Sequence, residues 1–217
     1  TRLIKTPEDD TSGILHPHFS HDGTLLTWTE MIEKPEFLKG FGNWVIKVAD
    51  FSIQDGTPVL ANIRQYQPGG KGFYENHGLS PDNRQLLFTS SFENTKAFHS
   101  NIYTYCLESG ELKCLAKDKW NEHALYSPKG DRIVWMSGRE NPNRGTDYWS
   151  MHPDGSGKAR LTDFNNPQLS GYNKKMVVSA DASFSPDGKY LVAYLQVDLV
   201  KQIGVTVLIE LASDWKK

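Results

Sequence analysis

The sequence predicts an all-β fold built from repeats, and two features of the 217-residue chain support this. First, a short apolar strand, a tight turn and a second strand recur as one phrase. Its clearest copy is residues 184–192, which read Phe-Ser-Pro-Asp-Gly-Lys-Tyr-Leu-Val. Proline fixes φ at one turn position, aspartate hydrogen-bonds its own backbone, and glycine accepts positive φ. Second, helical periodicity is absent apart from one short turn near residues 35–39.

The other copies of the phrase deviate in ways that keep the turn chemistry. They occupy residues 19–26, 79–87 and 126–134. Asn83 stands where the other copies have glycine, and asparagine is the next residue most tolerant of positive φ. His21 replaces the proline but is followed by Asp-Gly. We therefore expect positive φ at four turn positions, which are Gly23, Asn83, Gly130 and Gly188.

The spacing of the phrase predicts a β-propeller made of four-stranded antiparallel blades. The turn serines stand at 20, 80, 127 and 185, so the steps are 60, 47 and 58 residues. A period near 40–50 residues with insertions in loops is typical of stacked or radial repeats, and one propeller blade has this length. The whole chain, 1–217, is then one propeller domain or part of one. Its blades are expected at 14–64, 74–116, 123–163 and 181–211.

Within each repeat, strands are expected between the turn signals. In the first, Val45, Lys47 and Ala49 alternate with Ile46, Val48 and Asp50, as a strand requires. The first repeat gives strands at 15–20, 24–31, 44–51 and 57–64, and the second at 74–79, 85–89, 101–107 and 111–115. The third gives 124–126, 132–136, 147–151 and 158–162, and the fourth only 182–184, 190–195 and 205–211. Residues 1–6 look like the outer strand of a neighbouring or the last blade.

Charge and hydropathy argue against a nucleic-acid partner and against a membrane-spanning segment. The 24 basic and 26 acidic residues give a net charge of −2, which argues against a nucleic-acid partner, because such proteins carry a basic face. No apolar run approaches the roughly 20 residues of a membrane span.

The two cysteines, Cys106 and Cys114, flank a turn at Ser109-Gly110. They are either two thiols or a disulfide across the hairpin, because spacing alone does not set strand register.

These repeats resemble those of TolB-like propellers, the WD40-like family whose blades carry a Ser-Pro-Asp-Gly hairpin. Beside the four phrases, the resemblance rests on the strand at 147–151, the turn at 153–155 and the strand at 160–162. It covers nearly the whole chain and is specific for architecture rather than function. It implies a bacterial periplasmic or secreted protein. Because the family's rings are larger, it also implies that these four blades are part of a larger ring.

One face of the expected propeller gathers long loops. The loops between the second and third strands, and those between blades, share that face and are much longer than the turns at the other end. Long loops on one face indicate binding, although drift in unconstrained loops and packing between blades are the alternatives. Aromatic and arginine side chains suit interfaces and sugar or peptide sites. The candidates on this long-loop face are Phe37, Phe41, Phe92, Phe98, Arg139 and Arg144.

A second candidate site is a polar cluster at the start of the innermost strands, which line the axis of a propeller. Four residues before each turn serine stand His16, Asn76, His123 and Asp181, and His77 follows Asn76. Glu75 and Glu122 add carboxylates nearby. Imidazole and carboxylate are ordinary ligands of divalent metals, so a divalent metal is the one candidate cofactor, at His16, His77, His123 and Asp181. The alternative is a hydrogen-bonded ring that fixes the blade entries.

Two functions follow from these sites. The sequence lacks the Gly-x-Ser-x-Gly elbow of serine hydrolases and a glycine-rich phosphate loop that opens a helix. This favours non-catalytic recognition of a protein, peptide or glycan on the long-loop face. The alternative is a metal-dependent enzyme that resembles oligogalacturonate lyase, with its histidine-rich site at the central channel.

Overall fold

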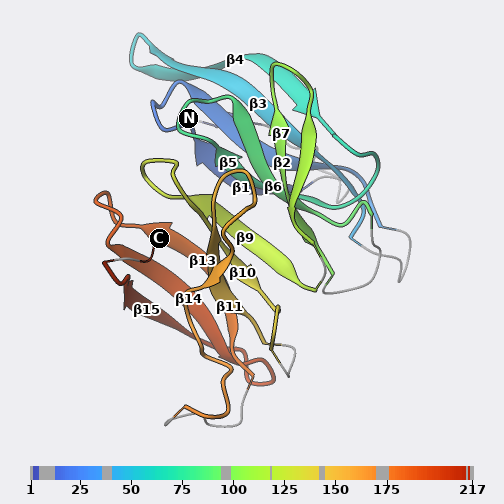
Figure 1. Cartoon of the computed structure of the whole chain (residues 1–217). Helices are drawn as coiled ribbons and strands as arrows, with labels where there is room; N and C mark the ends of the chain where they lie inside the picture. Colours follow the sequence, from blue (N-terminus) through green and yellow to red (C-terminus); the bar gives the residue numbers. More distant parts are fainter. Residues whose placement is uncertain are drawn as a thin grey trace. The chain divides into compact units, whose positions relative to one another are not determined.

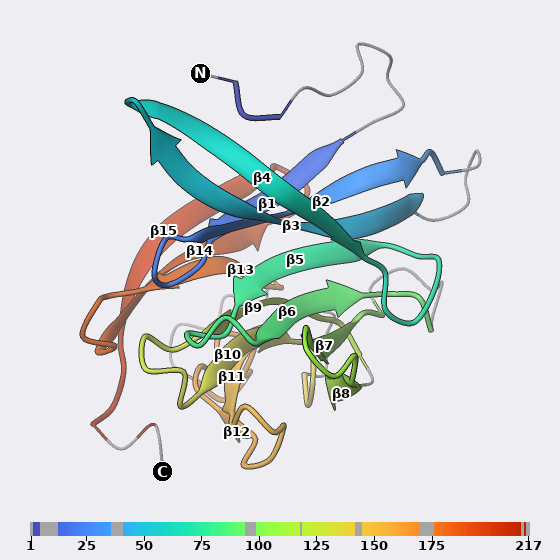
Figure 2. The ribbon, with the colours of Figure 1, turned by 90° about the horizontal axis from the view of Figure 1, so that it is seen from above.

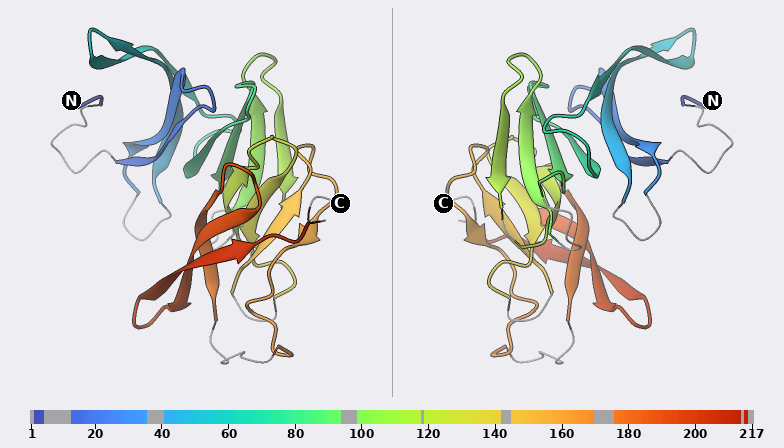
Figure 3. Two further views of the ribbon diagram at one scale, coloured as in Figure 1. Left: turned by 90° about the vertical axis from the view of Figure 1, so that its left-hand side faces the viewer. Right: turned by 90° about the vertical axis from the view of Figure 1, so that its right-hand side faces the viewer.

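The computed structural model describes residues 2–4, 13–35, 41–93, 99–117, 119–141, 145–169, 176–213 and 215. In this part of the chain all regular structure is β, arranged as four antiparallel sheets (Figure 1). Each sheet takes consecutive strands in chain order, as propeller blades do (Figures 2 and 3). The all-β fold and its four repeats are therefore confirmed.

The strands follow the predicted repeats closely. The first blade holds β1 (Ile14–Phe19), β2 (Leu25–Glu33), β3 (Asn43–Gln54) and β4 (Thr57–Tyr66). The second holds β5 (Tyr74–Leu79), β6 (Gln85–Ser90), β7 (Asn101–Cys106) and β8 (Leu112–Ala116). The third holds β9 (Asn121–Tyr126), β10 (Ile133–Ser137), β11 (Asp147–Met151) and β12 (Ala159–Arg160). The fourth holds β13 (Val178–Phe184), β14 (Tyr190–Asp198) and β15 (Ile203–Glu210), a sheet of three strands.

The chain divides into two compact units, residues 1–114 and 115–217. In the first unit, apolar side chains of β3 pack against β5, β6 and β7. In the second unit, side chains of β10 and β11 pack against β13 and β14. Each unit thus has a core between two neighbouring blades. Burial of the apolar sheet faces that meet there is the main contribution to the stability of the folded unit.

The turn serine organises every repeated hairpin. The hydroxyls of Ser20, Ser80, Ser127 and Ser185 each donate to an aspartate of the same turn at 2.5 to 2.7 Å. The same oxygen accepts the amide of the residue that opens the next strand or, in the third blade, of Arg132 just before that strand. These hydroxyl bonds are the main cause that lowers the pKa of Asp82 and of Asp187. The serine therefore bridges the two ends of the turn, which explains why it recurs.

Residues 2–4 do not form the strand expected at the start of the chain. Arg2, Leu3 and Ile4 lie in no strand, and Ile4 packs against the cluster of Leu26, Trp28 and Ala49 instead. The outer strand expected at 1–6 is thus not formed at residues 2–4, while residues 1, 5 and 6 lie outside the described part. That the four blades are part of a larger ring, as the resemblance implies, stays a prediction.

The two cysteines are not joined to each other. The amide of Cys106 donates to the carbonyl of Glu111 at 2.9 Å, which sets these two residues opposite each other. Cys114 therefore lies three residues further along the neighbouring strand.

The turn positions have the expected backbone, with φ of 71° at Gly23, 61° at Asn83, 69° at Gly130 and 71° at Gly188. We expect Gly188→Val to lower the free energy of unfolding by about 1–2 kcal/mol through left-handed strain. A Cβ at this position would meet only ordinary contacts, the nearest at 3.5 Å. Urea unfolding measures the effect, and Gly188→Asn is the control that should lose clearly less. Equal losses for valine and asparagine would contradict the turn argument.

Candidate functional site

The polar cluster lies where each innermost strand is irregular. The pairing of β1 with β2 shifts register between Leu15 and His18, and β5, β9 and β13 have equivalent shifts. The backbone has positive φ at His16 (48°) and at His123 (50°). Positive φ is unfavourable for residues other than glycine and is often found at functional sites. At His16 in the first blade and at His123 in the third, the bulge therefore changes the direction of the side chain from that in a regular strand.

In the first unit the bulge brings histidines and a carboxylate together. The Nε2 atom of His16 lies 3.1 Å from Oε1 of Glu75, whose side chain is 5% exposed. The ring of His77 lies 6.2 Å from that of His16, measured between centroids, and its Nε2 lies 2.8 Å from the Thr89 hydroxyl. The ring of His18 stacks on that of His16 at 6.5 Å. The cluster thus centres on His16, which pairs with the nearly buried Glu75 carboxylate and has the rings of His18 and His77 beside it.

His18 was missed by the sequence analysis, which counted back a fixed four residues from each turn serine. Only Pro17 separates His18 from His16, and residues two apart in a strand lie on the same side, so strand periodicity could have found it.

Asn76 has a structural role in this cluster. Its side-chain amide donates to the carbonyl of His16 and to the hydroxyl of Thr27, both at 2.9 Å. Its side-chain oxygen accepts the amide of Gly78 at 3.1 Å, and its own amide donates to Thr29. Asn76 is fully buried, so these bonds satisfy it and tie the inner strand of the second blade to the first blade.

In the second unit a matching pair forms between the third and fourth blades. The Nδ1 atom of His123 lies 2.9 Å from Oδ1 of Asp181, and its Nε2 lies 4.0 Å from Oε2 of Glu122. In both units, then, a histidine with positive φ pairs with a carboxylate from the inner strand of the following blade.

The predicted residues are therefore brought together as two sets. His16, Glu75, Asn76 and His77 meet in the first unit, and Glu122, His123 and Asp181 meet in the second. That all of them line one central opening stays a prediction. Across the residues that the structure describes, no group of three or more His, Cys, Asp or Glu side chains is arranged to hold a metal ion.

On the long-loop face, the described phenylalanine candidates differ in how far their side chains are exposed. Phe41 is 61% exposed, and its ring lies 5.3 Å from that of Phe73. Phe92 packs instead against Tyr103, with centroids 4.9 Å apart, and against Tyr74. Phe92 thus covers a core, whereas Phe41 is available for contact. Phe37, Phe98 and Arg144 lie outside the described residues.

Arg139 lies over an aromatic surface of the third blade. Its guanidinium carbon is 5.6 Å from the centroid of the Trp149 ring, and its Nε is 3.7 Å from Glu140. At the base of the same loop, buried Asp147 accepts hydrogen bonds from Asn141 and Arg160. Asp147 also accepts the Phe164 amide, so one carboxylate fixes two long-loop segments. The sequence analysis assigned this network no role.

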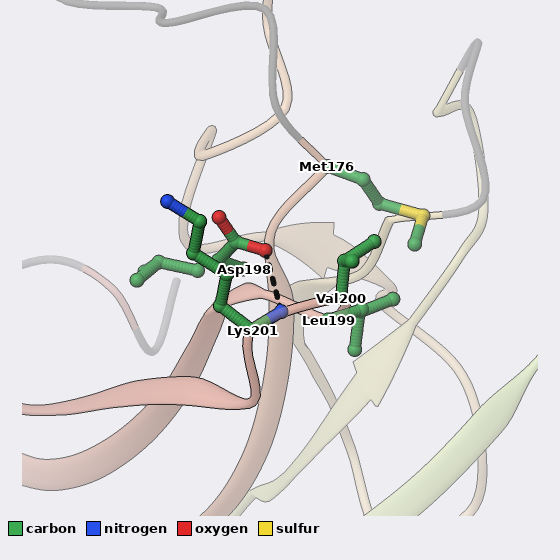
Figure 4. Close-up of a pocket in the computed structure, with 6 residues that line it drawn as sticks. Met176, Asp198, Leu199, Val200 and Lys201 are labelled. Atoms are coloured by element: carbon green, nitrogen blue, oxygen red, sulfur yellow. Dashed lines mark hydrogen bonds between the residues drawn. The ribbon is translucent and has the colours of Figure 1, made fainter.

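The long-loop end of the fourth blade carries a small apolar pocket of about 380 Å³. It is formed by Met176 and by the hairpin that joins β14 to β15 (Figure 4). The amide of Lys201 donates to Asp198 at 3.0 Å and closes the hairpin tip. Leu199 is 42% exposed and Val200 is 95% exposed. The tip therefore presents apolar side chains directly to solvent.

Comparison with known proteins finds similar solved structures but no similar sequences. No family model matches the sequence, and no curated protein sequence matches it. TolB from Acinetobacter baumannii has a similar structure, with a TM-score of 0.58 at 19% identity, over 90% of this chain and 43% of that chain. A putative TolB from Agrobacterium tumefaciens gives 0.51 at 17% identity, over 92% of this chain and 82% of that one. A puromycin-hydrolysing peptidase from Mycobacterium tuberculosis gives 0.56 at 15%, over 94% and 30%.

These likenesses define the class of protein as a β-propeller. More closely, the blades are similar in fold to those of the two TolB structures, as the resemblance of the repeats implied. The chain spans less than half of the A. baumannii TolB chain that it matches. At these identities the likeness concerns the fold alone. The described part of the chain contains no helix with the length and hydrophobicity needed to cross a membrane.

The His16–Glu75 pair should couple the first two blades energetically. In a double-mutant cycle with His16→Asn and Glu75→Gln, we expect an interaction free energy of about 1 kcal/mol, because Glu75 is nearly buried. Asparagine is chosen because it tolerates the positive φ at this position. Urea unfolding of the four proteins measures the coupling, and additive losses would contradict the pairing.

Proposed function

We propose that this chain is a non-catalytic recognition module that binds a protein, peptide or glycan through its long-loop face. By resemblance to TolB-like repeats, its proposed location is the periplasm or outside the cell. The observation that carries the proposal is the apolar tip of the β14–β15 hairpin, with Val200 95% exposed beside the pocket of Met176 and Leu199.

The remaining support is the chemistry of this face. Exposed Phe41 and the Arg139–Trp149 pair are side chains of the kinds that are enriched at interfaces. The base of the loop that carries Arg139 is held by the buried carboxylate of Asp147. Side chains at loop ends that are held in this way lose little conformational entropy on binding.

Selection on the immobilised 217-residue chain tests the proposal, with a random peptide library and a glycan array as probes. We expect ligands from at least one probe, and Val200→Asp should weaken their binding by about tenfold or more, because it places a charge in a desolvated contact. Ile53→Asp is the matched control, since Ile53 is 58% exposed at the short β3–β4 turn. Failure of both probes, or equal weakening by the two variants, would count against the proposal.

The second candidate, a metal-dependent enzyme, has one observation in its favour, which is the group of His16, His77 and Glu75. Imidazole and carboxylate would suit zinc or manganese, and the metal would act there as a Lewis acid. Their arrangement in this structure is not that of a metal site, which is why this function ranks second.

Metal analysis separates the two candidates. If the second holds, protein dialysed against zinc or manganese retains about one equivalent of metal, and His77→Ala loses it while His21→Ala in an exposed turn keeps it. Substoichiometric metal in the unmodified protein would eliminate this candidate.

A further inference from the structure

Aspartate is followed by glycine at four turns of this chain, and one of these turns differs from the other three in its hydrogen bonds. The four steps are Asp22-Gly23, Asp55-Gly56, Asp154-Gly155 and Asp187-Gly188. An Asp-Gly step can react with itself, because glycine has no side chain to shield its amide nitrogen from the preceding carboxyl group. Whether it reacts depends on whether the turn holds these two groups in other interactions.

At every step except Asp55-Gly56, both groups are held. The glycine amide donates to the carbonyl three residues earlier, at 2.8 to 3.0 Å. The aspartate accepts the amide two residues later, at 2.9 to 3.1 Å, and a serine hydroxyl at 2.6 or 2.7 Å. These bonds lower the pKa of Asp22, mainly through the Thr24 amide, and that of Asp187, mainly through the Ser185 hydroxyl. Such a carboxyl group stays ionised, and an ionised carboxylate is a poor electrophile.

At Asp55-Gly56 both groups are free. In the part of the chain that the structure describes, neither the carboxylate of Asp55 nor the amide of Gly56 makes a hydrogen bond. The two residues have positive φ, 49° and 74°, as the central positions of a type I′ hairpin turn require. A Cβ on Gly56 would meet no atom within 4 Å, so the turn is open on that side. Of the four steps, this one alone leaves its nucleophile and its electrophile available.

The turn stands on the least supported part of the first sheet. The pairing of β2 with β3 begins at Leu25↔Asp50, whereas that of β3 with β4 continues to Gln54↔Thr57. The end of the β3–β4 hairpin therefore has two strands only and projects past the rest of its blade (Figures 1 and 3). A two-stranded hairpin is marginally stable by itself, so this end opens readily. Propeller blades pack on one another's sheet faces, as in this unit, so the turn stays accessible in a ring of any size.

We propose that Asp55 is a site of spontaneous isoaspartate formation. The amide nitrogen of Gly56 bonds to Cγ of Asp55, and the carboxyl hydroxyl leaves as water with the amide proton. Water then adds to either carbonyl of the five-membered imide and breaks the bond from that carbonyl to nitrogen. Breakage at the original peptide carbonyl leaves the chain running through Cβ, whereas breakage at Cγ restores aspartate. One water is released and one is consumed, so the reaction needs no other reactant.

The product lengthens the turn. Isoaspartate adds one backbone atom to a loop of two residues, whose geometry allows no insertion, so the adjacent pairing of Gln54 with Thr57 is the first to be lost. The β3–β4 turn and the β2–β3 loop lie at opposite ends of β3. The modification is therefore independent of the recognition role proposed for the long loops.

Peptide mapping of aged protein tests the proposal. The 217-residue chain is incubated at mildly acidic pH below its unfolding temperature, and electron-transfer fragmentation locates isoaspartate in its peptides. We expect formation at Asp55 to be about tenfold or more faster than at the other three steps, because those must first break their hydrogen bonds. In urea, which removes the turns, the four rates should converge. Asp55→Glu should abolish the signal at this position, because glutamate would have to form a larger ring.

The variant Ser185→Ala tests the cause of the difference. It removes the hydroxyl that holds Asp187, so we expect faster isoaspartate formation at Asp187 and an unchanged rate at Asp55, with circular dichroism to confirm folding. Equal rates at the four steps of the folded protein, a faster reaction at one of the other three, or no isoaspartate at Asp55 would overturn the proposal. An unchanged rate at Asp187 in the folded variant would overturn the hydrogen-bond explanation on which it rests.

Discussion

Burial of one sheet face against the next blade is the constraint on which the rest of the structure depends. In the first unit, Trp44, Ile46 and Val48 project from one face of β3 and pack against Tyr74 and the blade behind it. A single twisted sheet of this size cannot bury enough apolar area to offset the entropy lost on ordering its chain. Two blades with facing apolar residues can, which is why each compact unit contains a pair of blades.

That constraint determines where polar side chains are tolerated. Thr27, Thr29 and Asn76 are buried between the inner strands of the first two blades, and each is satisfied by the others or by backbone. Such bonds contribute little net stability individually but fix register, because any slip would leave a buried group unpaired. The His16–Glu75 and His123–Asp181 pairs extend the same principle to histidines that remain partly exposed.

Much of the fold could be predicted because its signals are local. The turn phrase fixes φ, capping hydroxyl and hairpin direction within nine residues, so strands and repeat boundaries follow from it. The site was less predictable, because the sequence does not show the bulges that give His16 and His123 positive φ, and because Cys114 is positioned by a register set at Cys106 and Glu111. The packing of Ile4 on Leu26 and Trp28 is a contact distant in sequence, and a strand-like composition at residues 1–6 could not anticipate it.

At the tip of the β14–β15 hairpin, exposed apolar side chains lie next to one another, which distinguishes them from single exposed apolar residues. Single exposed apolar residues are common on protein surfaces and require no explanation. At this tip, however, Leu199 and Val200 are adjacent, border a pocket with Met176, and stand on a hairpin closed by the Lys201–Asp198 hydrogen bond. Their exposure costs solubility without a gain in the stability of the core. Under the proposed recognition role, this apolar tip beside a pocket is the surface that a partner would cover.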